Sequence, residues 1–209
     1  MDTLLDSGRY SDLRIVCREK SWNVHRNVLS TASSVFERMI DELPADSRPG
    51  VIDLTKYDPN IVEKMLRFIY QKDYDDERGI VPARLSIIIA LQEPAQPIPN
   101  GEALIINIKV LIIAEDFGLN DLMNLAMEKY TEAIYELWDT PSFEGSIVLL
   151  YNSGIDKVRS RKLLRVTANI IAGNVAMLLE RKSFRDVLNL YGKLATEVLS
   201  MIMTEKGWL

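Results

Sequence analysis

The hydrophobic pattern changes half-way through the first forty residues. In residues 12–17, the apolar side chains Leu13, Ile15 and Cys17 alternate against Asp12 and Arg14, which is typical of a strand with one buried face. Residues 21–25 (SWNVH) predict a hairpin partner for this strand. Between residues 28 and 40, apolar residues recur at steps of three and four, as on one face of a helix. Ser34 followed by Glu37 has the form of a capping box, so two short helices that share one buried face are predicted here.

The pattern continues with a third strand and a longer helix. Residues 50–54 (GVIDL) predict the strand, and Asp58 with Pro59 has the form of a helix start. Apolar residues then continue at helical spacing to about Tyr74. Residues 75–101 hold four prolines around one apolar run, which indicates an insertion: a loop, with one extra strand as the alternative.

The remainder of the chain has only helical patterns. Nearly every position from 102 to 117 is apolar, which predicts a helix buried on most sides and ended by Gly118. The next helix is predicted to begin at Asn120 or Asp121. Beyond residues 138–142 (WDTPS) further helices are predicted, the last opened by Ser183 and continuous to residue 202.

Composition and charge narrow the class of partner. The chain has 209 residues, 47% of them hydrophobic and 26% charged, with a formal net charge of −5. This excess of negative charge argues against nucleic acid, whose phosphates require a concentrated positive surface. One basic cluster stands out, and it is interpreted as a solvated helix face, with contact to an acidic partner as the alternative. Its members are Lys157, Arg159, Arg161, Lys162 and Arg165.

Targeting signals and catalytic motifs are not evident in the sequence. A single cysteine cannot form an internal disulfide, the first ten residues are polar, and the apolar run 103–114 is too short to span a bilayer. A cytoplasmic or nuclear protein without a membrane partner is therefore expected. His25 and Cys17 are the only histidine and cysteine; we interpret Cys17 as a core residue and His25 as a corner residue whose ring nitrogens bond to the backbone. No enzyme activity, cofactor or metal site is expected.

Several short motifs resemble those of BTB/POZ domains. The matching positions follow the order of the family pattern over residues 11–39: Ser11, Asp12, Leu13, Ile15, Trp22, Val24, His25, Arg26, Val28, Leu29, Ser33, Val35, Phe36 and Met39. Residues 50–54, 60–74 and 110–130 are similar to the segments that follow in this family. The resemblance covers about residues 5–135. The insertion, the segment DLTKYDP and the helical tail resemble the corresponding features of BTB proteins of filamentous fungi.

This resemblance implies an α+β fold, with a small sheet packed on a helical cluster and an all-α extension after it. The expected domains are 1–137, which contains the insertion 75–101, and 138–209. His25 is similar to a structural histidine of the family. The resemblance implies a protein–protein interaction module, with a substrate adaptor for a cullin-type ubiquitin ligase as the first interpretation; the alternative is a self-associating scaffold or a transcription-related interaction module without a ligase role.

The resemblance also suggests two sets of partner-binding residues. Asp12 and Arg26 are expected to pair in a shallow polar pocket, with an ordinary exposed ion pair as the alternative. A cullin-facing surface is expected at Ile40, Leu43 and Asp46, although the residues before the third strand copy the family's cullin motif poorly. The alternative for Leu43 is that it folds back onto the third strand. Homo-oligomers are an alternative to the cullin, but not through an N-terminal strand swap, because only ten residues precede Ser11.

Overall fold

The structure is a computed structural model that describes residues 4–44, 49–78, 100–153, 155 and 157–205. The chain divides into two compact units. The first consists of Met1–Asp75 and Lys109–Ala126, and the second of Asp76–Ile108 and Met127–Leu209. Helices α6 (Glu102–Asp116) and α7 (Asn120–Leu137) contribute residues to both units. The predicted boundary after residue 137 stays a prediction.

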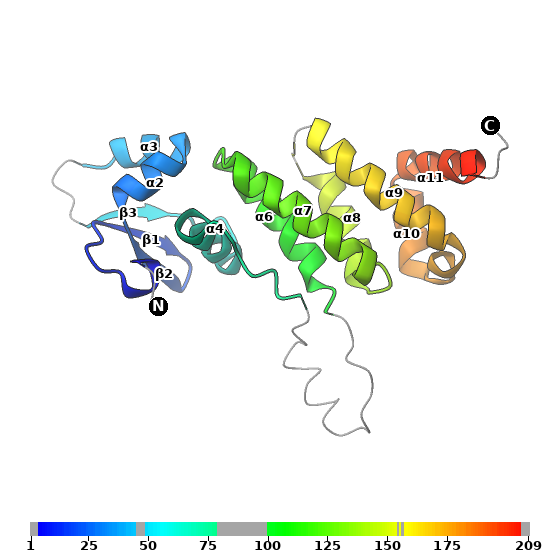
Figure 1. Ribbon diagram of the computed structural model, residues 1–209, viewed down its shortest axis with the longest axis horizontal. Coiled ribbons are helices and arrows are strands. Elements are labelled where there is room, and N and C mark those ends of the chain that lie inside the picture. Colours follow the sequence, from blue (N-terminus) through cyan, green and yellow to red (C-terminus); the bar gives the residue numbers. More distant parts are fainter. Residues whose placement is uncertain (1–3, 45–48, 79–99, 154, 156, 206–209) are drawn as a thin grey trace, which may run out of the picture. The chain divides into compact units, whose positions relative to one another are not determined.

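A three-stranded sheet forms part of the first unit (Figure 1). Its central strand β1 (Leu13–Cys17) pairs antiparallel with β2 (Lys20–Val24) and parallel with β3 (Gly50–Asp53). Leu13, Ile15 and Cys17 of β1 are buried, as the alternation predicted. A parallel partner requires a crossover connection. Two helices lie on this connection: α2 (Arg26–Ala32) and α3 (Ser34–Asp41).

Helix caps explain where the helices of the first unit begin. Ser33, not Ser34, caps α3: its hydroxyl accepts from the N–H groups of Val35 and Phe36, both at 3.2 Å. The predicted capping box was therefore one residue too late. Asp58 caps α4 (Pro59–Gln71) as predicted, accepting from the N–H of Asn60 at 3.0 Å. Helix α4 ends three residues before Tyr74, and the short helix α1 (Leu4–Ser7) precedes the sheet.

Three aromatic residues form a cluster within the first unit. The rings of Phe36 and Phe117 lie 4.5 Å apart between centroids, and the Tyr57 ring lies 5.8 Å from Phe117. The Ser33 hydroxyl donates to the carbonyl of Phe117 at 2.6 Å, so the cap of α3 is also tied to this core. Gly118, at φ 64°, follows Phe117 in the left-handed conformation predicted for the end of α6.

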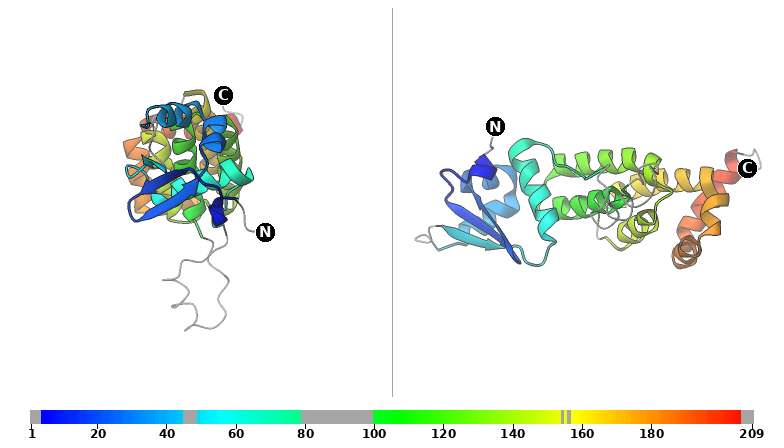
Figure 2. Two further views of the ribbon diagram at one scale, coloured as in Figure 1. Left: turned by 90° about the vertical axis from the view of Figure 1, so that its left-hand side faces the viewer. Right: turned by 90° about the horizontal axis from the view of Figure 1, so that it is seen from below.

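The second unit is helical in its described part and ends in a cluster coloured yellow to red in Figure 2. Its C-terminal helices are α8 (Ser142–Asn152), α9 (Lys157–Glu180), α10 (Lys182–Leu190) and α11 (Gly192–Glu205). Helix α9 packs against the other three. Tyr130 of α7 is fully buried, and its hydroxyl lies 3.1 Å from that of Ser146. The N-terminal part combines a sheet with helices, and the described residues after it are helical. This order confirms the predicted α+β fold.

The last helix differs from its prediction. Tyr191, at φ −117° and ψ 68°, interrupts it and separates α10 from α11. Ser183 lies inside α10 rather than at its start, and its hydroxyl donates to Glu144 at 3.1 Å. The apolar spacing is nearly unchanged across Tyr191, so it gave no signal of the break.

Helix α9 contains a second long apolar stretch. Residues Arg161–Glu180 are long and apolar enough, by length and composition only, to cross a membrane, and 33% of their most apolar window is buried. A core helix of a protein without membrane segments also meets this criterion. This stretch is separate from the apolar run 103–114.

Candidate interaction surface

Asp12 and Arg26 contact each other, but mainly through backbone groups. The carboxylate of Asp12 accepts from the N–H of Arg26 at 2.9 Å, and Nε of Arg26 donates to the carbonyl of Asp12 at 3.4 Å. Arg26 is the first residue of α2, and the N-cap residue His25 makes no side-chain cap. Asp12 therefore caps α2 from the start of the sheet, where a negative charge is favoured by the helix dipole. A role for this pair in binding a partner stays a prediction.

Leu43 lies against the beginning of β3. A Cβ atom at Gly50 would lie 2.7 Å from Cδ1 of Leu43 and 2.6 Å from Nη2 of Arg26. A side chain at this position would therefore displace the ends of the Leu43 and Arg26 side chains. Leu43 is half-buried, so one part of its side chain contacts β3 and the rest is exposed.

The other two predicted cullin-facing residues differ from Leu43. Ile40 is buried on the inner face of α3, so it offers little surface to a partner. Asp46 lies outside the described residues. Of these three predicted residues, Leu43 is therefore the one that is both described and partly exposed.

His25 links three segments of the first unit. Its Nε2 lies 2.7 Å from the carbonyl of Arg9, which can only accept, so Nε2 carries a proton. Its Nδ1 then accepts from the hydroxyl of Tyr70 at 2.9 Å, and this hydroxyl also accepts from the backbone N–H of His25 at 2.9 Å. Burial raises the pKa of Tyr70, so the phenol stays protonated and can donate. The predicted backbone contact holds for one ring nitrogen, and a tyrosine binds the other.

Cys17 is a core residue. Its side chain is buried, and its Sγ donates to the carbonyls of Leu54 and Tyr57 at 3.3 and 3.4 Å. Burial raises the pKa of the thiol, which disfavours the thiolate that a nucleophile needs. Cys17 and His25 share none of these partners, so the two residues form no catalytic pair.

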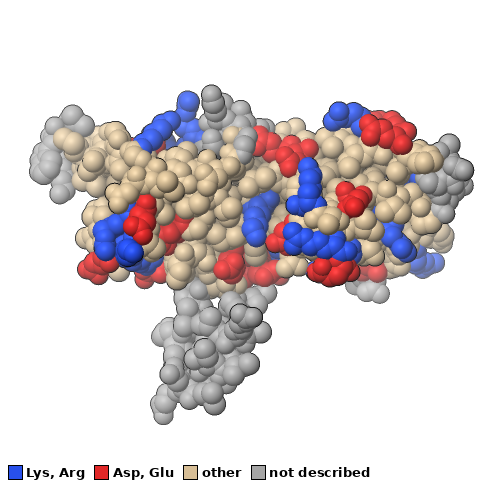
Figure 3. Space-filling model, turned by 180° about the vertical axis from the view of Figure 1, so that it is seen from behind, with Lys and Arg blue, Asp and Glu red and all other residues tan. Residues whose placement is uncertain are grey.

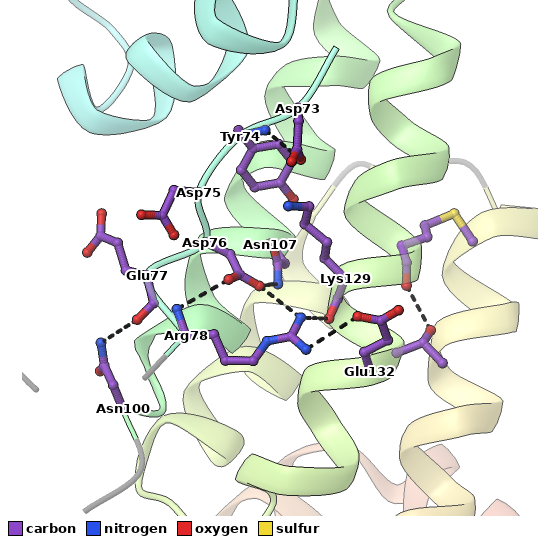
Figure 4. A network of polar contacts seen from close by, with 12 residues as sticks. Asp73, Tyr74, Asp75, Asp76, Glu77, Arg78, Asn100, Asn107, Lys129 and Glu132 are labelled. Atoms are coloured by element: carbon purple, nitrogen blue, oxygen red, sulfur yellow. Dashed lines mark hydrogen bonds and ion pairs between the residues drawn. The ribbon is translucent and has the colours of Figure 1, made fainter. Parts of the chain in front are cut away.

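The second unit contains a polar network that the sequence analysis missed (Figure 4). Asp76 is 6% exposed, and its Oδ2 accepts from Nη2 of Arg78 and from Nδ2 of Asn107, both at 3.0 Å. The guanidinium of Arg78 also donates to the Lys129 carbonyl at 3.0 Å and to the Glu132 carboxylate at 3.3 Å. An asparagine within the apolar run 103–114 was the available signal, because a buried amide requires polar partners.

The same region joins the two ends of the segment 79–99, which lies outside the described residues. Nδ2 of Asn100 donates to the carbonyl of Glu77 at 3.2 Å, and Oδ1 of Asn100 accepts from the N–H of Glu102 at 3.1 Å. The described residues that precede and follow this segment therefore lie side by side. The predicted loop or extra strand at 75–101 falls mostly on residues that are not described.

The surface charges of the chain are mixed in sign. On the face shown in Figure 3, basic and acidic side chains lie interspersed and do not form one broad basic area. Within the described parts of the chain, no group of three His, Cys, Asp or Glu residues could hold a metal ion.

Comparison with known proteins identifies the first part of the chain. Residues 1–96 match the family model of the BTB/POZ domain. The N-terminal part of this chain is a BTB/POZ domain. Among solved structures, the chain is similar to the BTB domain of zebrafish PATZ1, with 16% sequence identity over 59% of this chain and 77% of that chain and a TM-score of 0.38.

BTB/POZ domains are protein–protein interaction modules rather than a family of catalysts, and this chain therefore contains such a module. The match confirms the resemblance drawn from residues 11–39. It ends within the segment 79–99, so α6 and the helices after it lie beyond the matched residues. The similarity to fungal BTB proteins stays a prediction.

Proposed function

We propose that this protein is a substrate adaptor for a cullin-type ubiquitin ligase, working in the cytoplasm or nucleus. Its BTB/POZ domain would bind the cullin, and the helices after it would extend the complex. The observation that carries the proposal is the position of Leu43. It lies at the start of the loop after α3, where the resemblance expects an apolar cullin contact, and it is half-buried against Gly50.

The packing of Leu43 favours binding. An apolar side chain that is already ordered loses little conformational entropy when it enters an interface. Exposed acidic residues, Asp41 and Glu42, immediately precede it, so charged groups lie around an apolar anchor. A buried apolar anchor inside a polar rim is the usual arrangement of a binding hot spot.

A self-associating scaffold is the second candidate. Three large apolar side chains in the described part of the BTB/POZ domain are strongly exposed: Leu4 at 51%, Tyr10 at 83% and Val51 at 49%. Val51 lies on β3, which is an edge strand of the sheet. Exposed apolar residues on an edge strand favour pairing with another chain.

Binding to a purified cullin N-terminal region tests the adaptor proposal. Wild type should bind it in a calorimetric titration, and Leu43→Asp should weaken binding by about thirtyfold or more, since loss of a hot-spot residue costs about 2 kcal/mol or more. Val51→Asp is the matched control, because it places the same charge at an exposed apolar residue of the same domain. Leu43→Ala removes the contact without adding a charge and should weaken binding in the same direction.

Two results would decide against the adaptor. One is a wild-type protein that shows no binding at tens of micromolar cullin. The other is equal binding by wild type, Leu43→Asp and Leu43→Ala, with melting curves showing all three folded. Light scattering on the same samples tests the scaffold: a wild-type dimer that Val51→Asp dissociates would favour self-association.

A further inference from the structure

The apolar residues of α10 and α11 follow one helical repeat, although the two helices are separate. If Lys182–Glu205 were one continuous helix, the buried apolar residues that the structure describes in it would fall within about 80° of one another around its axis. These residues are Phe184, Val187, Leu194 and Val198. The sequence of this segment therefore favours one long helix with a single apolar face, whereas the structure divides it at Tyr191.

A single residue makes the break. Tyr191, at φ −117° and ψ 68°, follows the last residue of α10, and Gly192 already belongs to α11. The carbonyl of Tyr191 accepts from the N–H of Leu194 at 2.9 Å, so α11 starts a new set of hydrogen bonds there. The first N–H groups of α11 and the last carbonyls of α10 have no partners within their own helices, and a continuous helix would pair them. The backbone itself therefore gains hydrogen bonds when the break closes into one helix.

Contacts of the Tyr191 side chain hold the break in place. Its ring stacks on Tyr151, with 4.3 Å between the ring centroids and 21° between the ring planes. Its hydroxyl donates to Oδ1 of Asn152 at 3.2 Å. Tyr151 and Asn152 are the last two residues of α8, so both contacts come from outside α10 and α11. Loss of the contacts of one side chain would thus free the segment to follow its own pattern.

Straightening at Tyr191 would move α11 away from its own bundle. Helix α10 packs against α8 and α9, and α11, the red helix in Figure 1, packs mainly against α9. If α10 keeps its place and the helix continues beyond it, α11 leaves α9. Leu194 and Val198 of α11, together with the part of α9 that they cover, would then be exposed to water, which is unfavourable. The two exposed surfaces fit each other, because they are packed together in the closed protein.

We propose that two copies of this chain exchange α11, with Tyr191 as the hinge. Each α11 would occupy, on α9 of the other copy, the place that the other copy's α11 has left. The contacts of α11 recur in such a dimer, and each copy gains the backbone hydrogen bonds of a continuous helix at the hinge. The cost is the entropy of association and the contacts of Tyr191 with Tyr151 and Asn152. This exchange involves neither the sheet nor Leu43, so it is independent of the proposed binding to a cullin.

Two substitutions at Gly192 test the exchange in opposite directions. A Cβ at Gly192 would meet no atom within 4 Å, so alanine fits the closed protein. Alanine is favoured over glycine inside a helix by about fivefold, so Gly192→Ala should lower the dissociation constant of the dimer about 25-fold, since each dimer has two hinges. Gly192→Pro should prevent the dimer, because proline suits the first turn of α11 but not the interior of a continuous helix.

Light scattering after size-exclusion chromatography measures the dimer. Each protein is incubated at hundreds of micromolar just below its urea midpoint, so that α11 can open, and is then returned to buffer. Wild type should form some dimer, Gly192→Ala more, and Gly192→Pro none, with circular dichroism showing that all are folded. Tyr151→Ala removes the ring stack and should also increase the dimer. Gly173→Ala is the matched control: it makes the same change at a glycine of α9 where a Cβ would also meet no atom within 4 Å, and it should match wild type.

A distance measurement shows whether the helix is straight in the dimer. Spin labels are attached to Lys182→Cys and Thr204→Cys, both at exposed positions, while the native Cys17 is buried. The dimer is formed with an excess of unlabelled protein, so that each labelled chain pairs with an unlabelled one. Electron–electron resonance should give a distance of about 33 Å in the dimer, as expected for a continuous helix that rises 1.5 Å per residue, and a shorter distance in the monomer.

Any of four results would overturn the proposal. Wild type and Gly192→Ala could both stay monomeric at hundreds of micromolar. Gly192→Ala and Gly192→Pro could form the same fraction of dimer, which would exclude a continuous helix at the hinge. The distance between the labels could be the same in dimer and monomer. Finally, Val51→Asp could dissociate the dimer, which would assign it to pairing of the edge strand β3 instead.

Discussion

The carboxylate of Asp76 is the group whose removal tests the polar network of the second unit most directly. It accepts from three donors: Nη2 of Arg78 at 3.0 Å, the Arg78 N–H at 3.2 Å, and Nδ2 of Asn107 at 3.0 Å. Hydrogen bonds to a charged group contribute about 1.5–3 kcal/mol each to stability. Asp76→Asn keeps the size and one acceptor but loses the charge, so we expect a loss of about 2 kcal/mol. Asp76→Ala should cost about 3 kcal/mol, the lower end for breaking a buried pair, because Arg78 is partly exposed.

The pH dependence gives this prediction a second observable. Burial alone would raise the pKa of Asp76, but hydrogen bonds from Asn107 and Arg78 and the charge of Arg78 outweigh it, and the pKa lies below its usual value. The unfolded chain therefore takes up the proton first as pH falls. The contribution of Asp76 is present above the pKa of the unfolded state, about 3.9, and is lost as pH falls through the lower pKa of the folded state. The difference between wild type and Asp76→Asn should be constant from pH 7 to about pH 5 and shrink below that.

Urea unfolding followed by circular dichroism, repeated from pH 7 to pH 3.5, measures both effects. A loss of about 2 kcal/mol corresponds to a melting temperature lower by about 4–8 °C for a protein of this size. Glu132→Gln is the control, because Glu132 binds the same guanidinium at 3.3 Å but is exposed, and it should cost less than about 1 kcal/mol. An Asp76→Asn protein as stable as wild type at pH 7, or a difference that persists unchanged at pH 3.5, would refute the reasoning.

Two further predictions concern the core and the insertion. Phe36→Ala should destabilise the BTB/POZ domain by about 3–5 kcal/mol, because Phe36 is fully buried against Phe117, and an unchanged urea midpoint would contradict this. Replacing residues 79–99 with a short Gly/Ser linker should leave cooperative unfolding intact, since Asn100 and Glu77 already hold the ends together and a shorter loop costs little to close. Aggregation or loss of the transition would show that the segment is part of the fold.

The sequence predicted the elements in which neighbouring residues determine the structure. Alternation located β1, and Asp58 with Pro59 located the start of α4, because a cap acts within one turn of its own residue. The same reasoning placed the cap of α3 at Ser34 instead of Ser33. Both are serines with suitable neighbours, and the backbone angles decide between them. The buried Ser33 hydroxyl, which donates to Phe117, depends on a contact 84 residues away.

Contacts between distant segments could not be predicted in the same way. The network of Asp76, Arg78 and Asn107 joins the start of the insertion to α6, and nothing in the local pattern of either segment indicates the other. Asn107 within an apolar helix was the one visible signal of a buried polar contact. The break at Tyr191 also depends on tertiary structure: the Tyr191 ring stacks on Tyr151 at 4.3 Å, and its hydroxyl donates to Asn152 at 3.2 Å.

Gly50 shows why the candidate cullin contact needs the structure as well as the motif. The sequence predicts a strand there, but not that the missing side chain leaves room for both Leu43 and Arg26. Arg26 in turn begins the helix that Asp12 caps. The two predicted binding sets, around Asp12 and around Leu43, therefore meet over the first residue of β3. A substitution at Gly50 would displace both sets together, whereas Leu43→Ala changes one, so comparing their effects on cullin binding distinguishes a shared surface from an independent contact.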